Sequence, residues 1–228
     1  MWVLPTLSRP AQCVKVIENL IAHKMTTAGV VFVNDPGMDV EGIKKVLPDN
    51  WELYVNDRNA GALGALDFIF KERPGEKFYG FIADDEFVQT DYWDLELIEA
   101  CGDWNIAHGD EGRDIEGRLQ GFACVGGELA RCVGYLTIPE TWHFFGFDNM
   151  WGEIALKGGC RSLFVRNVKI EHRHHYFGLA ERDECYALGE SRKDIDYQVY
   201  ANWLRTALPS VVSRVKTARE VGIKLKTG

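Results

Sequence analysis

Long hydrophobic runs are missing from this chain of 228 residues, so it lacks the roughly 20 consecutive apolar residues that a membrane-spanning helix requires. The N-terminus also lacks the basic region and extended apolar stretch that are typical of a secretory signal peptide. We therefore expect a cytoplasmic protein with no membrane partner. Internal repeats and low-complexity segments are missing too, and no pattern fixes an oligomeric state.

Cysteine pairs at metal-binding or redox spacing are also missing. None of the six cysteines forms a C-x-x-C motif, and they are scattered through apolar or glycine-rich stretches. This distribution argues against a zinc ribbon and against a disulfide framework. We expect reduced thiols with structural roles at Cys13, Cys101, Cys124, Cys132, Cys160 and Cys185.

The composition is that of a globular protein, with 46% hydrophobic residues and 12% aromatic residues. The formal net charge of −8 is unevenly distributed. Residues 76–116 contain 13 acidic residues against two basic ones, whereas residues 210–228 contain five basic residues against one acidic one. We predict one main domain over residues 1–190 and a helical extension over residues 191–228 that packs on it.

Apolar segments alternate with amphipathic segments over the first 100 residues or so. Four strand, loop and helix units in succession favour an α/β fold with a mostly parallel central sheet flanked by helices. The predicted strands in this region are 2–4, 29–33, 51–55 and 78–82, and the predicted helices are 11–24, 41–47, 63–70 and 92–100. Further along we predict a glycine-rich loop over 105–120, short strands at 121–127 and 136–139, a helix at 149–158, a strand at 162–171, and a tail helix with Ile195, Val199 and Trp203 on one side.

Three consecutive carboxylates, Asp84, Asp85 and Glu86, follow the apolar strand at 78–82. Ligands of open α/β sheets bind outside the carboxyl ends of the strands, so we expect this cluster to be exposed at such a site. Adjacent carboxylates repel one another, and a hard cation such as Mg²⁺ or Mn²⁺ with a diphosphate would make the arrangement favourable. The alternative is a polar turn in which Asp84 or Asp85 caps the next helix.

The order of these and other features resembles the GT-A fold glycosyltransferases, and among them the small single-domain enzymes of some bacteriophages. Each feature follows a predicted strand, and together they cover about residues 2–180. They are Pro-Thr-x-Ser-Arg-Pro at 5–10, Asn34-Asp35, Asp57-Arg58-Asn59-x-Gly61, the acidic segment 84–86, Asp148 before a helix, and Glu171-His172-x-His174. The third acidic position is Glu86, where the family motif has Asp.

The resemblance implies a UDP-sugar donor and a Mn²⁺ or Mg²⁺ ion. The metal ligands would come from Asp84, Asp85 and Glu86 together with His172 or His174. His172 is favoured because it shares a strand face with apolar neighbours. The nucleotide site would be lined by Thr6, Arg9, Asp35, Arg58, Asn59, Gly61 and Asp84, with Asp35 accepting from a uracil N–H and Arg58 near phosphate. Asp35 lies in Asn-Asp-Pro-Gly, which is equally consistent with a plain turn.

Asp148 is the predicted catalytic base of an inverting transfer. A carboxylate among aromatic side chains can have the raised pKa that removing a proton from an acceptor hydroxyl requires. The alternative role for Asp148 is the N-cap of the following helix. Asp110, Glu111 and Asp114, in the loop over the site, are the alternative bases.

The leading prediction is thus a metal-dependent, inverting glycosyltransferase that uses a UDP-sugar. The phage resemblance suggests a 5-hydroxymethylpyrimidine in DNA as the acceptor, and the basic last 19 residues would favour such a partner. Three other functions stay open: a sugar nucleotide hydrolase, a nucleotidylyltransferase, and a non-catalytic carbohydrate or nucleic-acid binding module. The nucleotidylyltransferase is disfavoured because residues 5–10 contain no glycine.

Overall fold

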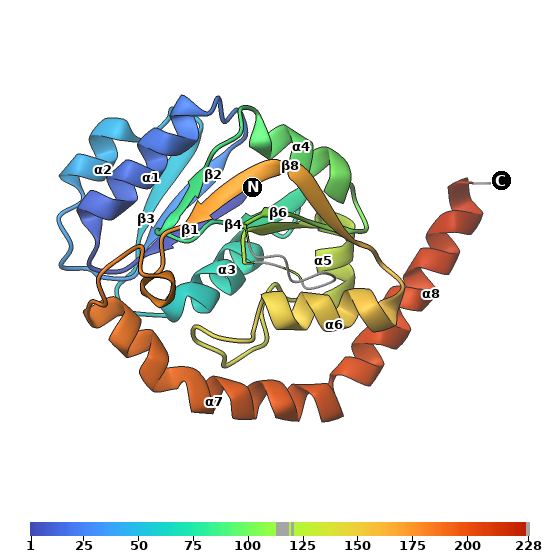
Figure 1. Cartoon of the computed structure of the whole chain (residues 1–228). Helices are drawn as coiled ribbons and strands as arrows, with labels where there is room; N and C mark the ends of the chain where they lie inside the picture. Colours follow the sequence, from blue (N-terminus) through green and yellow to red (C-terminus); the bar gives the residue numbers. More distant parts are fainter. Residues whose placement is uncertain (113–118, 120, 227–228) are drawn as a thin grey trace.

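The computed structural model describes residues 1–112, 119 and 121–226 (Figure 1). Within this part of the chain, eight strands form a sheet in the order β3-β2-β1-β4-β7-β6-β8-β5. β1 to β4 run parallel, β7 is antiparallel to β4 and β6, and β5 is antiparallel to β8. The strands are β1 Trp2–Thr6, β2 Gly29–Val33, β3 Trp51–Val55, β4 Phe78–Phe81, β5 Glu86–Val88, β6 Ile106–Asp110, β7 Ala123–Gly126 and β8 Ser162–His172.

Helices cover both faces of the sheet (Figure 1). On one face lie α1 Pro10–Ala22, α2 Glu41–Val46 and α4 Trp93–Cys101, and on the other lie α3 Gly61–Glu72, α5 Gly127–Val133 and α6 Asp148–Gly158. The 3-10 helix η1, His175–Phe177, leads to α7 Glu184–Thr206, and α8 Leu208–Lys226 follows.

The two hydrophobic cores explain why β1 is apolar at successive positions. Trp2 and Leu4 pack into the core under α1 and α4, whereas Val3 packs into the core under α3 and α6. A strand buried on both faces has no polar side, which is the pattern expected of a parallel sheet. Because β1 to β4 are parallel, their carboxyl ends lie at one edge of the sheet.

Most predicted elements of the first 100 residues are confirmed. The strands predicted at 29–33 and 51–55 are β2 and β3 without change. β1 extends the first predicted strand to Thr6. The ends of the four helices lie within two residues of the predicted positions. The mostly parallel α/β architecture is therefore as expected.

The second half departs from the prediction at three places. The segment 106–110 is strand β6, although its polar residues His108 and Asp110 predict a loop. Residues 136–139 form no strand, because the chain turns at Pro139 and Glu140, where the Ile138 carbonyl accepts from the Thr141 amide. The helix α5 was not predicted. In the first half, Glu86 begins a separate strand, β5, although the carboxylates were predicted only to follow the strand at 78–82.

The C-terminal region is built from α7 and α8, and α7 runs across residue 190. Val199 and Trp203 pack against the core as expected, but Ile195 is exposed and the neighbouring Asp196 is fully buried. All six cysteines are free thiols. No helix in the described residues is long and apolar enough to cross a membrane.

Candidate active site

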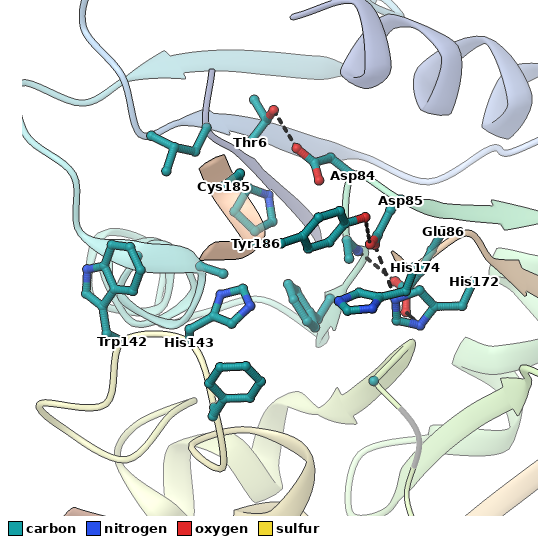
Figure 2. Close-up of a pocket in the computed structure, with 18 of the residues that line it drawn as sticks. Thr6, Asp84, Asp85, Glu86, Trp142, His143, His172, His174, Cys185 and Tyr186 are labelled. Carbon is teal, nitrogen blue, oxygen red and sulfur yellow. Dashed lines mark hydrogen bonds and ion pairs between the residues drawn. The ribbon is translucent and has the colours of Figure 1, made fainter. Parts of the chain in front are cut away.

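A cavity of about 390 Å³ opens at the carboxyl ends of β1 and β4 (Figure 2). Its walls come from the loop after β1, the acidic segment after β4, the loop before α6, η1 and the first turn of α7. The structure brings ten of the predicted site residues to this cavity: Thr6, Arg9, Asn59, Gly61, Asp84, Asp85, Glu86, Asp148, His172 and His174.

Asp84 is bound by two groups from the loop after β1. The Thr6 hydroxyl donates to it at 2.8 Å, and the Arg9 guanidinium donates at 3.1 Å. Burial raises the pKa of Asp84 to about 6, although the nearby Arg9 charge acts in the opposite direction. Thr6 and Asp84, at neighbouring strand ends, thus form a polar contact on one wall of the cavity, and both side chains are buried.

Arg9 joins the same wall to the start of α7. Its Nε and Nη2 atoms donate to the two oxygens of Asp183 at 2.7 and 2.6 Å, a bidentate ion pair. Its guanidinium also lies 3.9 Å from the centre of the Tyr186 ring. These residues are too far apart in the chain for the sequence to have predicted the contact.

Asp85 is buried, which corrects the expectation of an exposed carboxylate at a strand end; its exposed fraction is 4%. The Tyr186 hydroxyl donates to it at 2.8 Å, and His172 Nε2 lies 3.3 Å from its other oxygen (Figure 2). Burial alone would raise the pKa of Asp85, but the hydrogen bonds from His172 and Tyr186 hold it below its ordinary value.

Glu86, Glu111 and His172 form a group that has the chemistry of a divalent metal site. One potential ligand atom from each lies within 4.8 Å of the others. His172 Nδ1 is 3.3 Å from Glu111 and 3.7 Å from Glu86. Each carboxylate also accepts a backbone N–H, from Ala83 at 2.7 Å and from Phe122 at 3.2 Å, which fixes its orientation.

The charges of this group indicate what it is suited to hold. Burial raises the pKa of Glu86, and the neighbouring Glu111 adds to this effect. Burial lowers the pKa of His172, but hydrogen bonds to Asp85 and Glu111 raise it to about 10. A protonated imidazole therefore supplies positive charge among the acidic side chains of Asp85, Glu86 and Glu111. Two carboxylates and a neutral imidazole would fit Mn²⁺ or Mg²⁺ at the same place.

Glu111 was not predicted as a metal ligand, only as an alternative base. It directly follows β6, so it comes from a strand end like the other acidic residues. The position of Glu111 after a strand could not be recognised in the sequence, because residues 106–110 were predicted to be a loop. Asp110 pairs with Lys169, and Asp114 lies outside the described residues.

His174 lines the cavity but does not belong to the three-residue group just described. Its Nδ1 atom accepts from the Tyr176 amide at 3.2 Å, and its ring lies 4.5 Å from that of Tyr186. These contacts place His174 in the wall formed by η1 and α7.

Two predicted nucleotide contacts, Asp35 and Arg58, do not line the cavity. Asp35 accepts from the Gly37 amide at 2.9 Å and from the Ser8 hydroxyl at 2.7 Å, which is the turn arrangement considered above. Arg58 is exposed in a separate hollow beside α3.

Asn59 and Gly61 shape the entrance to α3. The Asn59 side chain accepts from the Gly61 amide at 2.9 Å. Gly61 has a φ of 75°, and a Cβ atom there would lie 2.3 Å from the Trp142 carbonyl oxygen. Glycine is therefore required for α3 to approach the loop before α6.

Asp148 is the first residue of α6 rather than its N-cap, a position that Phe147 occupies without a side-chain capping hydrogen bond. The carboxylate lines the cavity together with Phe144 and Phe145. His143 lines the cavity too, and burial lowers its pKa, which favours a neutral imidazole. Sequence reasoning had assigned no role to His143.

Comparison with solved structures identifies the fold. The structure of GalNAc-T7 with UDP, GalNAc and Mn²⁺ matches with a TM-score of 0.61 and 10% identity over 75% of this chain and 43% of that chain. TarS 1-349 of S. aureus with UDP-GlcNAc matches with a TM-score of 0.55 and 12% identity over 89% of this chain and 70% of that one. Glucosyl-3-phosphoglycerate synthase of Mycobacterium tuberculosis, in complex with Mn²⁺, UDP and glucosyl-3-phosphoglycerate, matches with a TM-score of 0.55 and 13% identity. This match covers 78% of this chain and 74% of that chain.

The fold is therefore the GT-A fold of nucleotide-sugar-dependent glycosyltransferases, as the sequence resemblance implied. The chain spans less than half the length of the GalNAc-T7 chain. No protein-family model matches the sequence, and the search of curated proteins finds no match.

Proposed function

We propose that this chain is a metal-dependent, inverting glycosyltransferase that moves a sugar from a UDP-sugar to a hydroxyl acceptor. The observation that carries the proposal is the position of Glu86, Glu111 and His172. They lie in a GT-A fold cavity that also contains the carboxylate of Asp148.

The donor would lie along the wall formed by the carboxyl ends of β1 and β4. Asp84 is positioned there by Thr6 and Arg9, and Arg9 gives this side a permanent positive charge. Glu86, Glu111 and His172 would hold the metal. When bound, Mn²⁺ or Mg²⁺ would neutralise the charge that grows on the diphosphate as the glycosidic bond breaks.

Asp148 would act on the acceptor. Its carboxylate would take the proton of the acceptor hydroxyl while that oxygen forms a bond to the anomeric carbon and the bond from this carbon to the diphosphate oxygen breaks. Attack opposite the leaving group inverts the anomeric centre. The aromatic side chains around Asp148 would exclude water from this step.

For the acceptor we propose a 5-hydroxymethylpyrimidine in DNA. The support is the basic C-terminal segment, of which α8 forms the greater part and in which Arg214 and Lys216 are exposed. Figure 1 shows α8 extending away from the sheet, where a long acceptor could contact it. Phosphate contacts by such residues supply sequence-independent affinity.

The test is a panel of UDP- and GDP-sugars with Mn²⁺ in which release of the nucleoside diphosphate is measured with and without hydroxymethylated DNA. We expect release from a UDP-sugar that requires Mn²⁺, is stopped by EDTA and is stimulated by the modified DNA. Unmodified DNA of the same sequence is the control. Release that no acceptor stimulates would favour the hydrolase, and the absence of release from every donor would contradict the proposal.

A further inference from the structure

We infer that Asp196 on α7 is a positioning residue that sets the acceptor side of the cavity. The inference rests on the proposed function, because it concerns how Asp148 and its surroundings are held. The relevant segment is the aromatic loop, defined as residues 141–147, which directly precedes Asp148 at the start of α6.

Asp196 binds the backbone of the aromatic loop at three consecutive residues. One carboxylate oxygen accepts the Trp142 amide at 3.0 Å, and the other accepts the amides of His143 and Phe144 at 2.8 and 2.9 Å. The Asp196 side chain is fully buried. A buried carboxylate is costly unless its charge is compensated, and here three N–H groups converge on it. These three buried hydrogen bonds therefore fix the backbone of the aromatic loop.

The loop held in this way carries side chains that line the cavity (Figure 2). Those of Trp142, His143, Phe144 and Phe145 all reach its wall, and Asp148 follows within three residues of the last. Phe145 has a φ of 62°, an unusual value for a residue with a bulky side chain. Such a backbone persists only where its surroundings determine it, and Asp196 holds the three amides that directly precede Phe145.

α7 supports the same loop at a second point. A Cβ atom on Gly189 would lie 2.9 Å from the His143 ring, so the absence of a side chain there lets the imidazole pack on the helix. On the opposite side, the Leu63 amide donates to the Trp142 carbonyl at 3.2 Å. The aromatic loop is thus held between α3 and α7, and within the part of the chain that the structure describes all three amides donate to Asp196.

The donor side has different supports. Thr6 and Arg9 both donate to Asp84, and Arg9 is held in turn by Asp183 and Tyr186 at the start of α7. The Glu86, Glu111 and His172 group is oriented by backbone amides outside the aromatic loop. None of these contacts involves Asp196. A change at Asp196 should therefore displace the acceptor side while leaving the donor side in place. This separation distinguishes a positioning role from a general contribution to folding.

The test compares Asp196→Asn with Asp194→Asn, a matched change at an exposed position on the same helix. An amide keeps the size of the side chain but has one acceptor oxygen and turns an NH₂ group toward the loop amides. Three quantities are measured on the full chain: hydrogen exchange of the amides at 142–144, affinity for UDP with Mn²⁺, and the rate at which UDP is released from UDP-glucose and UDP-N-acetylglucosamine in the presence of hydroxymethylated DNA.

We expect Asp196→Asn to speed exchange at the three amides and to slow UDP release by about 10- to 100-fold, as displacements near 1 Å do, with little change in UDP affinity. Asp194→Asn should behave as the wild type. Unchanged exchange or unchanged release in Asp196→Asn would overturn the inference, and so would a loss of UDP affinity as large as the loss of rate. A wild-type protein that neither binds UDP nor releases it would instead refute the proposed function, and the exchange measurement would still decide whether Asp196 holds the loop.

Discussion

The Tyr186 hydroxyl donates a hydrogen bond of 2.8 Å to Asp85, joining the first turn of α7 to the acidic segment between β4 and β5. Tyr186 also stacks under Arg9, which binds Asp84. The carboxylates that follow β4 are therefore supported from the C-terminal part of the chain. This support explains how adjacent acidic residues stay buried, although each would be costly alone.

Replacing Tyr186 by Phe tests this support. The change removes the hydroxyl that donates to one oxygen of the buried Asp85, while His172 still faces the other oxygen, so we expect a loss of about 1 to 3 kcal/mol in the free energy of unfolding. Urea denaturation measures it. Tyr176→Phe is the matched control, because the Tyr176 hydroxyl bonds to Glu190 at an exposed position and its loss should cost less than about 0.5 kcal/mol. Equal losses in the two variants would show that the hydrogen bond to Asp85 stabilises the fold no more than an exposed one.

Glu111→Gln tests the metal group. The amide keeps the shape of the side chain but removes a charged ligand, so Mn²⁺-dependent UDP affinity should fall at least about tenfold. Asp110→Asn, one residue earlier, removes a carboxylate that is paired with Lys169 instead, and its UDP affinity should stay near that of the wild type. Isothermal titration calorimetry gives both values. If the two variants bind UDP equally well, Glu111 is not a ligand.

Metal binding should release a proton from His172. Its pKa is raised to about 10 in the metal-free site, so it is protonated at neutral pH, whereas a metal ligand must be neutral. Affinity for Mn²⁺ should therefore rise with pH between 6 and 8, by up to about tenfold per unit if this proton alone is displaced. Calorimetry in two buffers of different ionisation enthalpy counts the protons. Binding that releases none would contradict protonation of His172.

Asp148→Asn separates catalysis from structure. An amide cannot take a proton, so turnover should slow by roughly 10² to 10⁴ if Asp148 is the base. Stability should fall by less than about 1 kcal/mol, since an amide of the same shape replaces a charge in the first turn of α6. Turnover at saturating donor and acceptor is compared with a melting curve. Near-normal turnover would move the base assignment to another carboxylate.

Local patterns in the sequence predicted the parts of this molecule that depend on neighbouring residues. Apolar runs gave the parallel strands β1 to β4, and polar residues after each run marked the edge where the cavity lies. Asp84 was placed at this edge in this way, whereas Asp148 and His172 came from the resemblance to GT-A fold enzymes. The reasoning succeeded because parallel strands bring their carboxyl ends to one edge whatever lies between them.

The remaining site residues depend on contacts between distant parts of the chain. Tyr186 meets Asp85 across 101 positions, His172 meets Glu111 across 61, and Asp196 meets the His143 amide across 53. No local periodicity records such pairs. The predicted apolar side of this helix included Ile195, but Ile195 is exposed and Asp196 is buried, because the loop amides make burial of its charge favourable.

The proposed function depends above all on this cavity binding the nucleotide part of a sugar donor through a divalent metal. The most direct test is a calorimetric titration of UDP into the wild-type chain, first with Mn²⁺ and then with excess EDTA. The account predicts saturable binding at one site with Mn²⁺, lost with EDTA and lost in Glu86→Gln. Binding of equal strength in EDTA, or no binding in Mn²⁺, would contradict it.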